Sequence, residues 1–172
     1  MLTAKLLFVY LLQTANNFGL NVDTSKIDPA EAFCLAENIY YEAKGEDIQG
    51  QYAVASVTLN RVNDGRFPKS VCAVVKQSIV SKKTAICAFS WYCENNRKEK
   101  EISFRNRDGT INQSVVDQFQ IASIVAITVL SGSVQDNTKG ATHFHNPYLS
   151  DPSWRYQMKK TMRMGNHDFY KM

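Results

Sequence analysis

The sequence lacks a C-x-x-C pair, an internal repeat, a low-complexity tract and a long hydrophobic run. Without closely paired cysteines, neither a zinc ribbon nor a thioredoxin-like redox motif is expected. The N-terminal apolar run at residues 6–12 is far shorter than the roughly 20 residues that cross a bilayer, so no stable membrane span is predicted. A length of 172 residues without repeats suits one compact domain.

The sequence carries only a small excess of positive charge. The formal net charge is +4 and the sequence pI is about 8.8. This suits adsorption to an anionic cell envelope or to nucleic acid, but many enzymes that act at neutral pH look the same. No nucleic-acid partner is therefore inferred. An apolar content of 44% with 21% charged residues is ordinary for a soluble globular protein.

The N-terminal segment allows two interpretations. Lys5 followed by the apolar run 6–12 resembles a minimal secretory signal or anchor. The alternative is an amphipathic helix that packs on the domain. Residues 16–27 are polar and rich in turn formers, which is typical of a linker. We therefore divide the chain into an apolar segment with linker, 1–27, and a domain, 28–172.

Four cysteines, an even number, allow two disulfides in three pairings. They are Cys34, Cys72, Cys87 and Cys93. The short spacing of the last two suits a bridge that closes a small loop. The alternative is four buried thiols in a reducing compartment. The count favours an oxidising site of action.

The first strong helix signal begins at Asp28, which can cap a helix whose first residue is Pro29. Glu31 gives a spacing like that of a capping box. Apolar residues then recur at helical intervals, and Gly45 is a natural end. The sequence therefore predicts a helix over 28–44.

The remaining pattern predicts an α+β domain, with helices first and short strands last. Residues 161–164 and 167–170 flank Gly165-Asn166, a plausible two-residue hairpin turn. Further helices are expected at 48–63, 70–77 and 114–130, a loop or short strand at 85–94, and an exposed loop at 97–113.

Glu42 is the sharpest chemical signal. It lies three, four and seven positions after Ile39, Asn38 and Leu35, on the side of the helix that carries apolar residues. It also sits in the last turn, where the helix dipole disfavours a negative charge. Both effects raise the pKa of a carboxyl group, as a general acid at neutral pH requires. The alternative is a surface glutamate paired with Lys44 or Arg61.

Five segments, in order, closely resemble the SleB/CwlJ-type cell wall hydrolase domain. The first is the run Glu42-Ala43-Lys44-Gly45-Glu46 within the stretch Cys34 to Arg61, and the resemblance covers residues 33–171. The others are Leu59 to Val62 with Phe67-Pro68, Cys87 to Cys93 (CAFSWYC), Gly140 to His145 (GATHFH) and Gly165 to Tyr170 (GNHDFY). Each alone is weak, and the ordered set is specific.

The resemblance implies a lysozyme-like fold and a lytic transglycosylase activity that needs one catalytic glutamate and no cofactor. The first glutamate of the run corresponds to Glu42. Glu46 is then expected to have a supporting role, although its position after the helix end also suits an exposed residue or a cap for the next helix.

The three histidines all fall late in the chain. His143 and His145 have the spacing that places two rings on one face of a strand, and His167 could complete a zinc site. Contact with sugar or peptide is the competing interpretation, which we favour, so no metal is predicted.

Flat aromatic rings can stack on sugar faces, although most aromatic residues belong to the core. We favour Trp91 and Tyr148 for a glycan cleft because they lie in irregular segments, and Tyr41 is included among the supporting or substrate-binding residues. The candidates are Tyr40, Tyr41, Trp91, Tyr92, Tyr148 and Trp154.

The sequence therefore predicts an enzyme that cleaves peptidoglycan glycan strands with Glu42, as a monomer in the periplasm or cell envelope of a bacterium. Two other classes stay open. One is a zinc-dependent amidase or peptidase built on the late histidines, and the other is a wall-binding module without activity.

Overall fold

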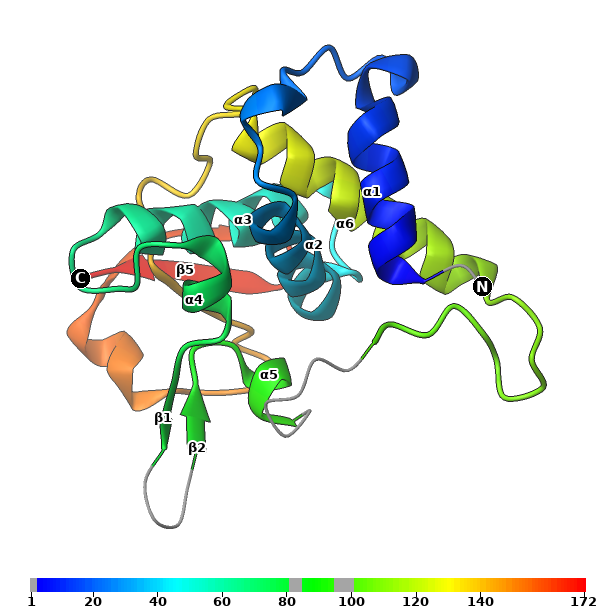
Figure 1. Cartoon of the computed structure of the whole chain (residues 1–172). Helices are drawn as coiled ribbons and strands as arrows, with labels where there is room; N and C mark the ends of the chain where they lie inside the picture. Colours follow the sequence, from blue (N-terminus) through cyan, green and yellow to red (C-terminus); the bar gives the residue numbers. More distant parts are fainter. Residues whose placement is uncertain (1–2, 81–84, 95–100) are drawn as a thin grey trace.

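The computed structural model describes residues 3–80, 85–94 and 101–172, and it has the predicted α+β, lysozyme-like architecture (Figure 1). A group of helices packs around α2, and two small antiparallel sheets lie on one side of it. The helices are α1 (Ala4–Thr14), α2 (Pro29–Ala43), α3 (Ile48–Asn63), α4 (Val71–Val75), α5 (Ser90–Glu94) and α6 (Gln113–Leu130).

Helix α2 is the centre of the core, because α6, α3 and α4 all pack against it. Leu35 and Ile39 of α2 and Phe119 of α6 are fully buried. The Asp28 carboxylate caps α2 by accepting from the backbone N–H groups of Ala30 and Glu31. The prediction of this helix is confirmed.

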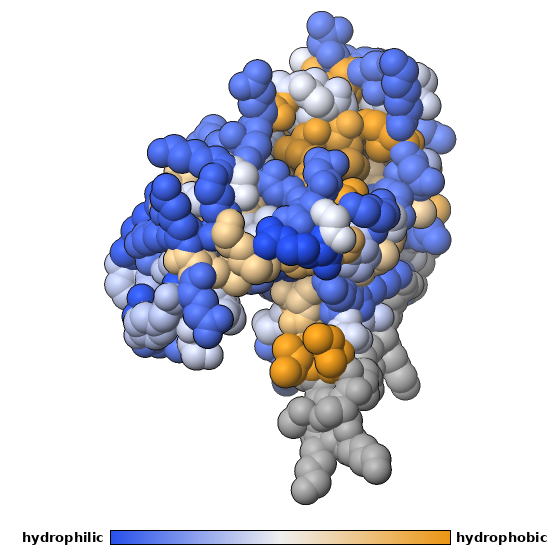
Figure 2. Space-filling model, turned by 90° about the vertical axis from the view of Figure 1, so that its left-hand side faces the viewer, coloured by the Kyte–Doolittle hydropathy of each residue, from blue (hydrophilic) through white to orange (hydrophobic). Residues whose placement is uncertain are grey.

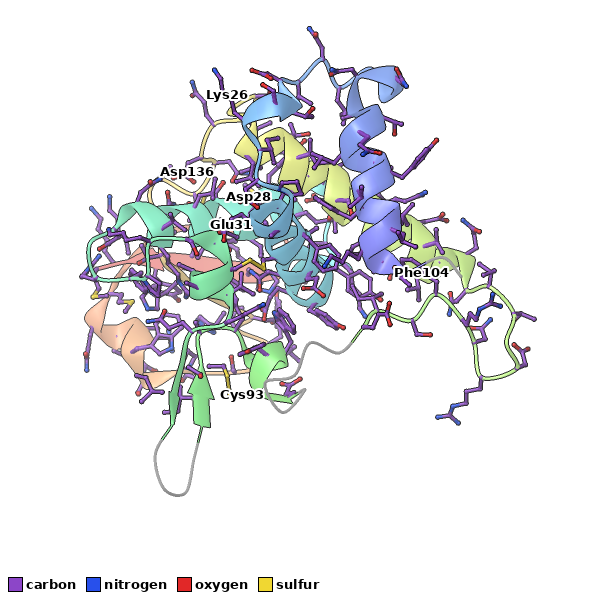
Figure 3. All side chains as sticks on the ribbon, viewed as in Figure 1. Lys26, Asp28, Glu31, Cys93, Phe104 and Asp136 are labelled. Atoms are coloured by element: carbon purple, nitrogen blue, oxygen red, sulfur yellow. A yellow bond between two sulfur atoms is a disulfide. The ribbon has the colours of Figure 1, made fainter. Side chains whose placement is uncertain are left out.

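Glu31 does not complete a capping box. Its Oε2 accepts a hydrogen bond from the backbone N–H of Cys72 at 3.0 Å, so the carboxylate connects α2 to the first turn of α4. Figure 3 shows Glu31 beside Asp28 near the start of α2. The Glu31 carboxylate therefore bonds to the distant residue Cys72, and not to the backbone at the start of its own helix as the spacing suggested.

Helix α1 packs in the same core, as the second interpretation of the N-terminal segment expects. Phe8 is fully buried and meets Phe33 of α2 edge-on, with ring centroids 5.7 Å apart. The segment that follows is not a simple linker. It contains the 3₁₀ helices Ala15–Phe18 and Thr24–Lys26, and Val22 and Ile27 are buried in the core.

Helix α6 is, among the described residues, the one helix long and apolar enough to cross a membrane by length and composition. Half of that 18-residue window is buried inside the domain. Its apolar residues contact α2, α3 and α1, so packing in the core accounts for its composition.

The segment before α6 differs from the exposed loop that we predicted. Ile102 and Phe104 are buried, and the Phe104 ring lies 5.9 Å from that of Phe119. Figure 3 shows Phe104 where this segment meets the helical group. Two apolar residues in a charged segment gave no periodic signal. Residues 97–100 of the predicted loop lie outside the described residues.

The first sheet is a two-stranded ribbon, β1 (Ser78–Val80) and β2 (Ala85–Cys87), called the β1–β2 ribbon below. The helix predicted at 70–77 is shorter, because α4 ends at Val75. Residues 85–94 were expected as a loop or strand, and β2 is followed there by the short helix α5. A five-residue helix is too short for apolar periodicity to reveal.

The second sheet has the order β3–β5–β4, built from β3 (His143–His145), β4 (Lys159–Met164) and β5 (His167–Lys171). The predicted hairpin at Gly165-Asn166 is confirmed, and Gly165 has a φ of 55°. Phe169 of β5 is fully buried against Ala53 and Val57 of α3. The sheet is thereby fixed to the helical group.

Glu46 holds the hairpin turn in place. Its carboxylate accepts hydrogen bonds from the backbone N–H and the Nδ2 of Asn166, at 3.1 and 3.0 Å. A Cβ at Gly165 would overlap Oε2 of Glu46. The cap of α3 is Asp47, whose carboxylate accepts from the N–H of Gly50. The expectation that Glu46 is exposed or caps α3 is therefore wrong.

All four cysteines are paired. Cys34–Cys72 joins α2 to α4, and Cys87–Cys93 closes a loop between β2 and α5. The spacing favoured the Cys87–Cys93 bridge. Once these two cysteines are paired, only Cys34 and Cys72 remain to pair with each other. Two disulfides fit the expected oxidising site of action.

We predict that a thiol titration of the protein in denaturant without reductant detects no free thiol.

Replacing both Cys34 and Cys72 by serine should lower the free energy of unfolding by about 3–4 kcal/mol, because the bridge closes a loop of 38 residues in the unfolded chain. Urea unfolding measures this. The Cys87→Ser/Cys93→Ser protein is the control, and a smaller loss, about 2 kcal/mol, is expected from its shorter loop. Equal losses would contradict the loop argument.

Gly165→Ala should lower the free energy of unfolding by about 2–4 kcal/mol, since alanine is strained at positive φ and its Cβ displaces the Glu46 carboxylate from Asn166. Gly140→Ala is the matched control. Gly140 has a φ of 79° and nothing within 4 Å of an added Cβ, so only about 1–2 kcal/mol should be lost there. A loss at Gly165 no larger than at Gly140 would mean that Glu46 does not hold the turn.

Candidate active site

A cavity of about 800 Å³ lies where the end of α2 meets both sheets. Its walls come from the α2–α3 turn, the β1–β2 ribbon, residues 87–91, the β3 strand with the segment to Trp154, and His167. Figure 2 shows the surface hollowed beside the ribbon. The cavity therefore combines segments from the whole length of the domain.

Six of the seven predicted site residues line this cavity. They are Tyr41, Glu42, Glu46, Trp91, His143 and His145. Tyr148 does not line it. Its side chain is 73% exposed and lies against the guanidinium of Arg163, 4.9 Å from the ring centroid. The prediction for Tyr148 relied on its irregular segment alone, which does not give the direction of the side chain.

Glu42 lies in the last turn of α2, with its side chain half-buried in the cavity wall. Burial raises the pKa of this carboxyl group to about 7, because the charged form loses hydration. The positive charge of Arg61 opposes that shift, and the negative charge of Glu94 adds to it. At neutral pH the group can therefore both give and take a proton.

Arg61 of α3 is a buried cation in the wall of the cavity. Its Nε donates to the carbonyl oxygen of Thr142 at 2.7 Å, and its Nη1 donates to that of Ala88 at 3.4 Å. The rings of Phe67 and Phe89 lie 5.5 and 4.8 Å from the guanidinium carbon. These contacts compensate for the lost hydration of the charge.

An aromatic pair forms the wall next to Glu42. The rings of Tyr41 and Trp91 stack with centroids 4.5 Å apart and planes 16° apart. The indole N–H of Trp91 donates to Oδ1 of Asn38 at 2.8 Å. The Nδ2 of this fully buried amide donates to Oγ1 of Thr58. The chain of hydrogen bonds fixes Trp91 relative to the helix that carries Glu42.

The three histidines are engaged in different ways. Nδ1 of His145 lies 3.0 Å from the carbonyl oxygen of Ser150 and must donate to it, and Nε2 lies 3.2 Å from the hydroxyl of Tyr170. His167 Nδ1 lies 3.6 Å from Oε1 of Glu46, and burial lowers the pKa of His167. Within the described ranges, no group of three side chains is arranged to hold a metal ion.

His143 faces the cavity as a neutral ring. Burial, reinforced by the charges of Arg61 and Arg66, lowers the pKa of His143 to about 4. Its Nδ1 lies 3.0 Å from the hydroxyl of Thr142, and its ring lies 5.2 Å from that of Trp154. A neutral imidazole beside an indole suits contact with an uncharged sugar.

Sequence reasoning missed several lining residues. Arg61 was considered only as a surface partner for Glu42, and Trp154 was one of six aromatic candidates without a favoured role. Glu94, Phe67 and Phe89 line the cavity as well. The family-like segments LNRV, FP and CAFSWYC contain three of these five residues, Arg61, Phe67 and Phe89, so the segments marked these three without giving their roles.

Two curated relatives are spore cortex-lytic enzymes. The protein of Halalkalibacterium halodurans is 30% identical over 135 residues, which cover 78% of this chain and 33% of that protein. The protein of Bacillus subtilis is 28% identical over 135 residues, covering 78% of this chain and 35% of that one. The chain thus spans about a third of the length of the curated relatives it matches.

Two solved structures share the fold. The catalytic domain of the germination-specific lytic transglycosylase SleB from Bacillus anthracis aligns with a TM-score of 0.57 and 24% identity, covering 86% of this chain and 98% of that one. The catalytic domain of the Bacillus cereus SleB protein aligns with a TM-score of 0.55 and 26% identity, covering 88% and 96%.

The family model of the cell wall hydrolases matches residues 45–170. The matched region begins just after Glu42 and includes the cavity walls formed by residues 45–170. This match spans most of the chain and agrees with the relatives in sequence and in fold. The chain belongs to the cell wall hydrolase family, of the SleB/CwlJ type.

Proposed function

We propose that the chain is a lytic transglycosylase that cleaves the bond between N-acetylmuramic acid and N-acetylglucosamine in peptidoglycan, with Glu42 as the single acid and base. The supporting observation is the half-buried carboxyl group of Glu42, whose pKa is raised to about 7 in the wall of a large cavity. Relatives in sequence are named as spore cortex-lytic enzymes, and a solved structure with a similar fold is named as the catalytic domain of a lytic transglycosylase.

The reaction uses one carboxyl group twice, first as an acid and then as a base. Protonated Glu42 donates to the glycosidic oxygen, and the bond from that oxygen to C1 of the muramic acid breaks. The resulting carboxylate then accepts the proton of the C6 hydroxyl of the same sugar, while the hydroxyl oxygen bonds to C1 and closes an anhydro ring. The acid is restored, and no water is consumed. A carboxyl group with a pKa near 7 suits both steps.

The surrounding residues have supporting roles in this proposal. The partly exposed rings of Tyr41, His143 and Trp154 provide surfaces for sugar rings. Trp91, which is only 8% exposed, supports the Tyr41 ring by stacking on it. Glu46 acts as a positioning residue, because it holds the turn that precedes His167. His145 supports the wall, since its two ring nitrogens are engaged by Ser150 and Tyr170.

Hydrolysis by a muramidase is the second candidate. Glu94 is a second carboxylate that lines the cavity, and its charge acts on Glu42. Most hydrolytic glycosidases use such a pair. The products separate the two reactions, because a transglycosylase releases anhydro-ended muropeptides and a muramidase releases reducing ends.

We infer that the substrate is met in the bacterial cell envelope or periplasm. The two disulfides suit an oxidising compartment, and the excess of positive charge suits an anionic wall. We propose that the chain acts there as a monomer.

Glu42→Gln should lower the release of anhydro-muropeptides from purified sacculi by about 10²–10⁴-fold, since the amide keeps the shape and loses the acid. Mass spectrometry of the released muropeptides measures this. Glu101→Gln, an exposed position away from the cavity, should keep the wild-type rate. Wild-type release by Glu42→Gln would refute the assignment, and reducing ends in place of anhydro ends would favour the muramidase.

The dependence of kcat/KM on pH should show a loss of activity above pH 7. Because burial raises the pKa of Glu42 from 4.5 to about 7, the acid is mostly protonated below that pH and ionised above it. We expect kcat/KM on soluble glycan strands to fall about tenfold per pH unit on the alkaline side. Circular dichroism at each pH checks the fold. A profile that already falls near pH 4.5 would contradict the raised pKa.

A further inference from the structure

An aliphatic ridge borders the proposed catalytic cavity. Ile79 of β1 and Ile86 of β2 are directly paired across the β1–β2 ribbon, and their exposed fractions are 71% and 68%. Paired residues of neighbouring strands lie on the same face. Both side chains line the cavity that contains Glu42, as does Leu149, which is 83% exposed.

This ridge differs chemically from the rest of the cavity wall. Around Glu42 the wall consists of flat rings and hydrogen-bonding groups, which suit sugar faces and hydroxyls. Branched aliphatic side chains neither stack on a sugar face nor bond to its hydroxyls. Neighbouring apolar groups exposed at the edge of a cavity are typical of a binding surface for an apolar group. The ridge therefore suits a methyl-bearing part of the substrate.

Peptidoglycan has such a part next to the scissile bond. The muramic acid carries a lactyl ether, and a peptide stem that begins with alanine is attached to it. When that sugar lies at Glu42, its stem must leave the cavity along one of the walls. Among the described strands, β1 and β2 pair only with each other, so the ribbon also offers backbone groups at its edges, with which an extended peptide can pair.

We propose that the ridge of Ile79 and Ile86 binds the first residues of the peptide stem, so that the enzyme recognises peptide-bearing muramic acid. This inference rests on the proposed function, because it places the glycan strand in the same cavity. It adds a specificity surface that is separate from the acid.

The test measures binding rather than turnover. Soluble glycan strands are prepared with intact stems and, in parallel, with the stems removed by an amidase. Calorimetry gives the Kd of Glu42→Gln protein for each, with and without the added changes Ile79→Thr and Ile86→Thr, since threonine keeps strand propensity and removes apolar surface. Ile111→Thr is the matched control, because Ile111 is 49% exposed in a β-bridge and does not line the cavity.

With the ridge intact, strands that carry stems should bind more tightly than stripped strands. The double threonine change should raise the Kd for stem-bearing strands about tenfold and leave the Kd for stripped strands unchanged, and Ile111→Thr should change neither. An unchanged Kd for stem-bearing strands, or an equal rise for both substrates, would overturn the proposal. Failure of the proposed function has a different signature, namely no anhydro products from either substrate with the unmodified enzyme.

Discussion

The buried guanidinium of Arg61 joins three segments that are distant in the chain. It projects from α3, donates to Thr142 just before β3 and to Ala88 in the disulfide loop, and packs against two phenylalanine rings. A charge without these partners could not remain in the core. The positive charge of Arg61 also lowers the pKa of Glu42 and thereby opposes the increase that burial causes. Arg61 thus links the assembly of the cavity to the proton affinity of its acid.

The parts of the fold that depend on local signals could be predicted from the sequence. Asp28 and Pro29 fix the start of α2, and the apolar spacing along that helix placed Glu42 on an inward side. Gly165-Asn166 marked the last hairpin, because only a few residue types adopt the backbone angles of a two-residue turn. The resemblance of five segments to a known family indicated the fold, and several of these segments form walls of the cavity.

The parts that depend on distant contacts could not be predicted. Ile102 and Phe104 are buried by helices that follow or precede them by many residues, and nothing in their charged neighbourhood indicates it. Glu46 looked like a residue near a helix start, yet its carboxylate binds a turn 120 residues later in the chain. The side chain of Tyr148 likewise lies against Arg163, which belongs to β4. Spacing along one segment cannot report any of these partners.

The bond between Glu46 and the hairpin turn also has a consequence for biosynthesis. Helix α2 leaves the ribosome well before the hairpin turn, because Asn166 follows Glu46 by 120 residues. A partly synthesised chain therefore has Glu42 but lacks one wall of the cavity around it. The cavity is therefore complete only after the β4–β5 hairpin has been synthesised and its turn has bound Glu46.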